Sequence, residues 1–153
     1  ARTRRAARRA ESWLAELSAG VDWRIPMRVC VGDLHREHVL FVGAAVTGMI
    51  DFEAICLDSV ARDLARLLGS LAPLERNRWP AALEAFDRVI SLTPDEGRLI
   101  DLFDRTGLVV ATLRWSEWHR RAGGEANSAS RGYQRWSELV DRLERVLESG
   151  LAT

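Results

Sequence analysis

Two aspartates in the first half of the chain, Asp33 and Asp51, are the residues whose types and spacing best suit chemistry. Asp33 follows the apolar segment MRVCVG, and Asp51 ends the apolar segment AVTGMI. The sequence between them predicts a hairpin, so the two carboxylates can converge although they are 18 residues apart (51 − 33). Two carboxylates with a polar ligand between them suit a divalent cation bound to phosphates, because Mg²⁺ takes few protein oxygens and keeps waters and substrate phosphates.

The residues around both aspartates resemble two motifs of a known enzyme group. GDLHREHVLF is similar to the catalytic loop HGDLHxxNIL of the aminoglycoside phosphotransferases and choline kinases, and MIDFE is similar to their second motif, I-D-[FW]-E. Kinases place a catalytic Asp about five residues before a metal-binding Asn, with a second metal-binding Asp downstream. The resemblance therefore implies ATP-dependent phosphoryl transfer to a small-molecule hydroxyl, with Asp33 as the general base and Asp51 as a metal ligand.

The chain departs from this pattern at two positions of the loop. Val31 replaces the first histidine, which is architectural in the group, and His38 replaces the metal-binding asparagine. A neutral imidazole can ligate a cation, but Mg²⁺ prefers oxygen, so His38 suits Mn²⁺ or Zn²⁺ better. The resemblance implies ATP and Mg²⁺, or Mn²⁺, as cofactors, with Asp51 and His38 holding the metal. His35 belongs to the loop of the group, where it is mostly structural.

A third resemblance follows the second motif. The segment DLARLL is similar to the helix whose aspartate braces the catalytic loop, and Asp63 matches that aspartate. Asp58 resembles the acidic residue before it, at a spacing one residue wider. We expect Asp63 to be buried and to accept hydrogen bonds from backbone N–H groups of the loop around His35, without taking part in the chemistry.

What a complete kinase needs and this sequence lacks is a Gly-rich phosphate loop with a lysine-bearing strand. All 22 basic residues are arginine, so a lysine is excluded by composition. We expect residues 1–153 to form a single domain that resembles the C-terminal, catalytic-loop lobe, with the N-terminal nucleotide-binding lobe absent. The missing lobe would be a partner of this chain, and the chain alone is expected to be inactive.

The hydrophobic pattern predicts an α+β fold that is mainly helical and positions these motifs on a short strand and a β-hairpin. The strands are expected in MRVCV, HVLFV and AVTGMIDF, and the helices in 10–17, 60–71, 82–90, 93–118 and 136–147. Thr93-Pro94-Asp95-Glu96 has the form of a capping box with proline in the first turn. Gly107 is a candidate interruption within the helix predicted over residues 93–118.

Composition limits the alternatives. With 153 residues, 47% apolar residues, 29% charged residues and no net charge, the chain is expected to be a cytoplasmic globular domain without a membrane partner. Cys30 and Cys56 form no CxxC pair, and we expect both to be buried structural thiols. The main rival hypothesis is a degenerate, non-catalytic kinase-like module. A weaker one is nucleic-acid binding through the basic residues of the first helix, Arg2, Arg4, Arg5, Arg8 and Arg9, and no nucleic-acid partner is expected.

Overall fold

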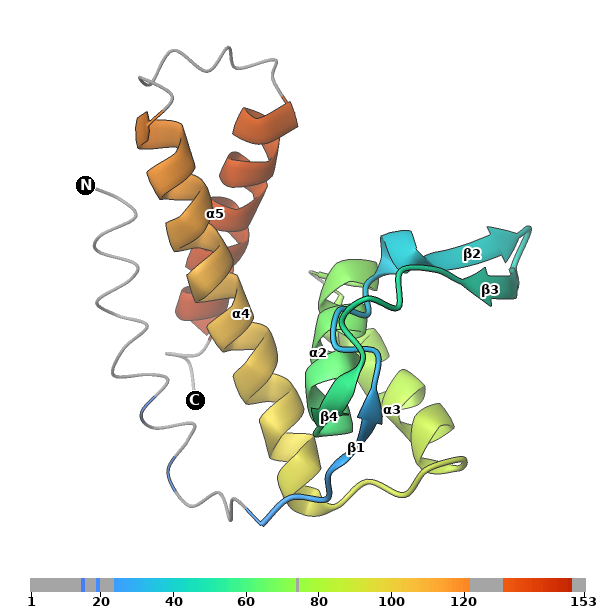
Figure 1. Cartoon of the computed structure of the whole chain (residues 1–153). Helices are drawn as coiled ribbons and strands as arrows, with labels where there is room; N and C mark the ends of the chain where they lie inside the picture. The colour runs from blue at the N-terminus through green and yellow to red at the C-terminus, as the bar shows by residue number, and fades with distance from the viewer. Residues whose placement is uncertain (1–14, 16–18, 20–23, 74, 122–130, 150–153) are drawn as a thin grey trace. The chain divides into compact units, whose positions relative to one another are not determined.

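A computed structural model of the chain describes Ala15, Ala19 and residues 24–73, 75–121 and 131–149 (Figure 1). These residues fall into two compact units, one of residues 20–104 and one of residues 1–19 and 105–153. The arginine cluster of the first helix and the predicted loop of residues 122–130 lie outside the described residues, as does the predicted first helix apart from Ala15.

The strands of residues 20–104 form two separate antiparallel pairs. β1 (Arg28–Cys30) pairs with β4 (Cys56–Asp58), and this register places Cys30 opposite Cys56. The sequence did not predict β4, because three residues that pair with a strand 26 positions earlier (56 − 30) carry no local signal. Its pairing brings the start and the end of the motif segment together. Cys30 is buried, but Cys56 is only partly so, which corrects half of the prediction for the two thiols.

The second pair is the predicted hairpin. β2 (Val39–Val42) and β3 (Ala45–Met49) are joined at Gly43, whose φ of 61° lies in the left-handed region that favours glycine. The one-turn 3-10 helix η1 (Arg36–His38) leads into β2. In Figure 1 the hairpin extends beyond the β1–β4 pair, and most of its apolar side chains are exposed.

The helix that follows β4 supplies much of the core of this unit. α2 (Val60–Leu71) begins at Ser59, whose side chain accepts a hydrogen bond of 3.2 Å from the N–H of Ala61 and so caps the helix. Its apolar face recurs with the helical period. The side chains buried along it are Val60, Ala61, Leu64, Ala65 and Leu68.

Two further helical segments complete the unit. The 3-10 turn η2 (Arg76–Arg78) leads into α3 (Trp79–Asp87), which ends before Val89 and Ile90. The predicted apolar stripe of this helix is therefore wrong at its end, and Val89 is 82% exposed. The sequence period continued beyond the hydrogen-bonded helix, because apolar spacing alone does not determine where a helix ends.

The capping box predicted at Thr93 is confirmed at the start of α4 (Pro94–Arg121). The Thr93 side chain accepts from the N–H of Glu96 at 3.1 Å, and the Glu96 carboxylate accepts from the N–H of Thr93 at 2.8 Å. The same carboxylate is fully buried and also accepts a hydrogen bond from the Arg28 guanidinium. It thus ties β1 to a helix more than 60 residues later. α4 continues through Gly107 without interruption.

In the second unit, the part of α4 from Arg105 onwards and α5 (Arg131–Ser149) form a helical hairpin. Their apolar faces meet in one core, as the periodicity predicted. The buried members are Leu108, Val109, Leu139, Leu143, Val146 and Leu147, with Ala111 and Trp115 packed against them. Trp118, near the end of α4, is 43% exposed.

The predicted fold class, mainly helical with small antiparallel strand pairs, is confirmed. Among the residues that the structure describes, none of the helices combines the length and the apolar character that crossing a membrane requires.

Candidate active site

One face of α2 holds the loop that connects β1 to η1, here called the aspartate loop (residues 31–35). Asp63 is 8% exposed, and its two carboxylate oxygens accept hydrogen bonds from the N–H groups of Val31 at 2.7 Å and Gly32 at 3.0 Å. The prediction that Asp63 is buried and steadies this loop is confirmed, with the donors lying just before Asp33. One turn after Asp63, Arg66 forms an ion pair with Asp33. Two turns after Asp63, the Ser70 hydroxyl accepts a hydrogen bond from the N–H of Arg36 at 2.8 Å.

The spacing of these three contacts explains why a helix can position the loop. Residues 63, 66 and 70 follow i, i+3 and i+7, so they lie on one side of α2. Asp63 and Ser70 together accept from three backbone N–H groups, which fixes the path of the loop regardless of its side chains. The sequence pointed to Asp63 by resemblance, but nothing in it singled out Arg66 or Ser70.

Gly32 allows the aspartate loop to approach the loop between β3 and β4, here called the second loop (residues 50–55). Its φ is +80°, and a Cβ atom at this position would lie 2.1 Å from the carbonyl oxygen of Ala54. Only glycine satisfies both conditions. Gly32 was part of the recognised motif, and the structure gives its physical reason: contact between the two aspartate-bearing loops.

Asp33 is partly exposed and is held from two directions. Its carboxylate pairs with Arg66 of α2, and its backbone carbonyl accepts a hydrogen bond from His38 Nδ1 at 2.8 Å. A carbonyl oxygen has no proton to give, so Nδ1 must carry the proton of the imidazole in this contact. The other ring nitrogen of a neutral His38, Nε2, then presents its lone pair.

Asp51 reaches the same histidine from the second loop. The N–H of Ile50 donates to the carbonyl of His38 at 3.0 Å, which ties the backbones together. Asp51 itself has a φ of +64°, a left-handed conformation that aspartate tolerates better than most residues. Its half-exposed carboxylate lies 3.4 Å from His38 Nε2. His38 thus contacts both predicted site aspartates, Asp33 through its backbone carbonyl and Asp51 through its carboxylate.

The pair of Asp51 and His38 is chemically suited to a divalent cation. The carboxylate oxygen and the imidazole nitrogen lie 3.4 Å apart. Ligands of one ion with bonds of about 2.0–2.1 Å lie roughly 3.3 Å apart in tetrahedral and roughly 2.9 Å apart in octahedral coordination, so a small shift brings both onto one ion. The nitrogen donor favours Mn²⁺ over Mg²⁺, which prefers oxygen. The donor set therefore fits a divalent ion that accepts mixed nitrogen and oxygen ligands.

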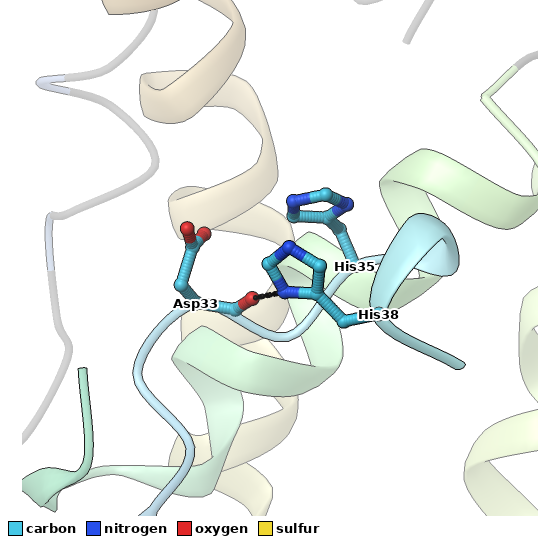
Figure 2. A group of neighbouring side chains, drawn as sticks. All are labelled: Asp33, His35 and His38. Atoms are coloured by element: carbon cyan, nitrogen blue, oxygen red, sulfur yellow. Dashed lines mark hydrogen bonds between the residues drawn. The ribbon is translucent and has the colours of Figure 1, made fainter. Parts of the chain in front are cut away.

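His35 lies directly beside His38 at this site. Its ring centroid lies 3.8 Å from that of His38, and Figure 2 shows its ring turned towards His38 and Asp33. Burial lowers the pKa of His35, and the neighbouring His38 lowers it further. His35 is therefore expected to be neutral at physiological pH. Asp33, His35 and His38 each offer a ligand atom within 4.8 Å of the others.

Asp58 stabilises the start of α2. Burial by itself would raise the pKa of its carboxyl, but hydrogen bonds from the Arg62 guanidinium and the Ser59 N–H outweigh burial and lower it. Both bonds are 2.7 Å long. Asp58 therefore stabilises the helix that carries Asp63 and Arg66.

Comparisons with known proteins place these motifs in context. The sequence model of the phosphotransferase enzyme family (APH) matches residues 1–102. The homoserine kinase of Methylorubrum populi is 35% identical over 86 residues, which cover 53% of this chain and 27% of the relative. The homoserine kinase of Methylobacterium sp. 4-46 is 33% identical over 104 residues, which cover 65% of this chain and 30% of the relative.

A solved structure has the same fold. It is the GDP complex of aminoglycoside 2'-phosphotransferase-IIIa, with a TM-score of 0.57 and 21% sequence identity. The match covers 92% of this chain and 44% of that one. The chain thus spans less than half of the solved structure and less than a third of the two curated relatives.

Proposed function

The chain belongs to the phosphotransferase enzyme family, and from this membership we propose that it is the catalytic lobe of an ATP-dependent phosphotransferase acting on a small-molecule hydroxyl. The observation that carries the proposal is that His38 contacts both Asp33 and Asp51. Two aspartates from separate motifs therefore lie close to one another, and phosphoryl transfer uses one such carboxylate as a base and another as a metal ligand.

Each residue has a distinct role in this proposal. Asp33 accepts the proton of the acceptor hydroxyl, and Arg66 and the His38 contact keep it in place. Asp51 and His38 hold the divalent cation, Mg²⁺ or, given the nitrogen donor, Mn²⁺. When bound, the cation neutralises negative charge on the transferred phosphate. Asp63 takes no part in proton transfer and keeps the aspartate loop in its conformation.

Homoserine is the acceptor that we propose to test first. The two relatives named above are homoserine kinases, and each is matched over less than a third of its own length. An amino acid with a primary hydroxyl fits the role of Asp33 as a base. The residues described around Asp33 do not by themselves select among alcohols.

The nucleotide-binding lobe is the partner that the proposal requires. Large apolar side chains of the hairpin and the neighbouring strands are exposed, among them Val29, Phe41, Val42, Val46 and Leu57. Exposed apolar surface of this extent is typical of a face that is covered in the complete protein. We propose that the lobe missing from this chain packs there and supplies the contacts to ATP.

The experiment is a coupled ADP-release assay on the full-length protein with homoserine as acceptor and Mn²⁺ or Mg²⁺ present. Asp33→Asn is expected to lower kcat by about 10²–10⁴-fold, the usual contribution of a general base. Asp51→Asn is expected to abolish activity by removing the metal. The matched control is Glu37→Gln, an exposed carboxylate on η1 beside the same loop. Activity that survives in Asp33→Asn at the level of Glu37→Gln would contradict the proposal.

The rival function, a non-catalytic module, is favoured by one contact. If His38 is protonated, its Nε2 forms an ion pair with Asp51 and occupies the place of the cation. Calorimetric titration of Mn²⁺ with nucleotide into the full-length protein separates the two. Binding that is lost in Asp51→Asn supports the enzyme, and no binding in either protein supports the non-catalytic module.

A further inference from the structure

Asp33, His35 and His38 form a group of potential metal ligands that is distinct from the Asp51–His38 pair, although it shares His38 with that pair. One carboxylate and two imidazoles offer ligand atoms within 4.8 Å of one another, and all three are partly buried. His35 has no role in the proposed chemistry. Figure 2 shows the His35 ring and the His38 nitrogen that does not bond to the Asp33 carbonyl on the same side as the Asp33 carboxylate.

We infer that Asp33, His35 and His38 form a binding site for a transition-metal ion of the zinc type, with a ligand set different from the Asp51–His38 pair. Two histidines and one carboxylate are a ligand set that Zn²⁺ and Co²⁺ bind readily. Mg²⁺ does not favour such a set, because two of its three donors are nitrogen.

The hydrogen bonds of the loop prepare His38 for this role. Its Nδ1–H donates to the carbonyl of Asp33 at 2.8 Å. A metal-binding histidine usually donates its other ring N–H to a carbonyl or carboxylate, which fixes the tautomer and orients the ring. Here the carbonyl belongs to Asp33, another member of the group, so the contact that orients His38 also fixes the backbone next to the Asp33 carboxylate.

His35 and Asp33 also have atoms to offer. His35 places a ring nitrogen within 4.8 Å of the ligand atoms of Asp33 and His38. Arg66 contacts Asp33 through Oδ1, which leaves Oδ2 for a ligand. Ligands of one tetrahedral ion lie roughly 3.3 Å apart. Since the ligand atoms lie at most 4.8 Å apart, rotation about the side-chain bonds needs to move them by only about 1–1.5 Å to reach this spacing.

An ion in this site would hold the carboxylate that we assign as the base and take His38 from Asp51. It would therefore act as an inhibitor, a consequence that rests on the proposed function. The site itself does not, because binding of a metal to the chain can be measured without nucleotide, acceptor or turnover.

The experiment is titration of Co²⁺ into the metal-free protein, followed by its visible absorption, with Zn²⁺ affinity measured by competition. We expect one equivalent to bind. His35→Asn and His38→Asn are each expected to weaken the affinity by at least about 10–100-fold, the range seen when a metal site loses even a supporting contact. His119→Gln, which changes the third of the three histidines, is the matched control and should bind as the wild type does.

Two further variants keep the outcomes distinct. Cys56→Ser should keep the affinity, and no sulfur-to-cobalt absorption should appear, so that binding by thiols is excluded. Asp51→Asn should weaken Co²⁺ binding far less than His35→Asn, although the proposed function requires it to abolish phosphoryl transfer. Unchanged Co²⁺ affinity in a folded His35→Asn protein, checked by circular dichroism, would overturn the inference. If His35→Asn does not fold, Asp33→Asn gives the same test.

Discussion

The segment from β1 to α2 and the α4–α5 hairpin are held together by different kinds of contact. In the first, three side chains of α2 bind the aspartate loop and the start of η1 through three backbone N–H groups and an ion pair with Asp33. In the second, six buried apolar side chains from two helices meet in one core. Apolar packing has little directional preference, whereas hydrogen bonds fix atoms to within a fraction of an ångström.

This difference separates the residues that determine the site from those that determine stability. A loop that must present Asp33 and His38 at defined distances needs directional contacts. A helical hairpin needs only apolar residues of suitable size in the right period. Substitutions in the first segment are therefore expected to alter stability and metal binding together, and substitutions in the second to alter stability alone.

The largest effect is expected from Gly32→Ala. A Cβ atom would lie 2.1 Å from the carbonyl of Ala54, at a φ of +80°. Because the obstacle is backbone, the two loops must separate, and we expect a loss of about 4 kcal/mol or more in the free energy of unfolding, with loss of Co²⁺ binding. Gly43→Ala is the control, since its φ is also positive but nothing lies within 4 Å. It should cost only about 1–2 kcal/mol. Equal losses in urea unfolding would show that the contact between the loops has no importance.

Leu143→Ala should have the next largest effect. This side chain is 1% exposed in the α4–α5 core, and its truncation is expected to cost about 3 kcal/mol through lost burial and a cavity. Co²⁺ affinity, measured at a temperature where the variant is folded, should not change. A parallel loss of metal affinity would break the separation between the two regions.

Asp63→Ala is expected to lower the free energy of unfolding less than Leu143→Ala does, but to lower the Co²⁺ affinity as well. It leaves the N–H groups of Val31 and Gly32 without their acceptor, which costs about 1–3 kcal/mol in the free energy of unfolding. The aspartate loop should also become less ordered, so Co²⁺ affinity falls although Asp63 is not a ligand. Asp63→Asn keeps one acceptor oxygen and should lose about half as much stability. A variant that melts like the wild type would contradict the assignment of Asp63.

The sequence predicted the features that depend on local patterns and missed those that depend on contacts between distant residues. Periodicity predicted α2, the hairpin strands and the core of α4 and α5, because those patterns repeat over many residues. The capping box was predictable because Thr93 and Glu96 are only three residues apart. The motifs identified Asp33, Asp51 and Asp63 through family resemblance, and the roles of the first two stay predictions.

The contacts that sequence reasoning missed are those made across the chain. Arg66 and Ser70 look like ordinary residues of an amphipathic helix, and only the fold shows that they face the aspartate loop. The position of His35 beside His38 depends on the turn of η1 between them. The burial of Glu96 against Arg28 required knowledge of a contact across 68 positions. No local pattern contains such information.

The smallest effect is expected at Glu117, a carboxylate that, unlike Asp63, lies on the surface of its unit. Hydrogen bonds from the Arg120 guanidinium, and next from that of Arg121, lower the pKa of Glu117 from 4.5 to about 2. Since the pKa in the folded chain lies below the ordinary value, the stabilisation is fully present above pH 4.5 and is lost as the pH falls towards 2. The pair is exposed and screened by solvent, so its contribution is small. We expect the Tm of the wild type to fall slightly more than that of Glu117→Gln between those pH values, with the difference reduced by high salt.

At pH 7, Glu117→Gln should lower the Tm less than Asp63→Ala does, because water replaces the lost acceptor for the two arginines but cannot readily reach the buried N–H groups of the aspartate loop. An equal loss of Tm in the two variants would mean that the buried carboxylate of Asp63 contributes no more stability than the exposed carboxylate of Glu117. That result would contradict the difference drawn here between the two regions.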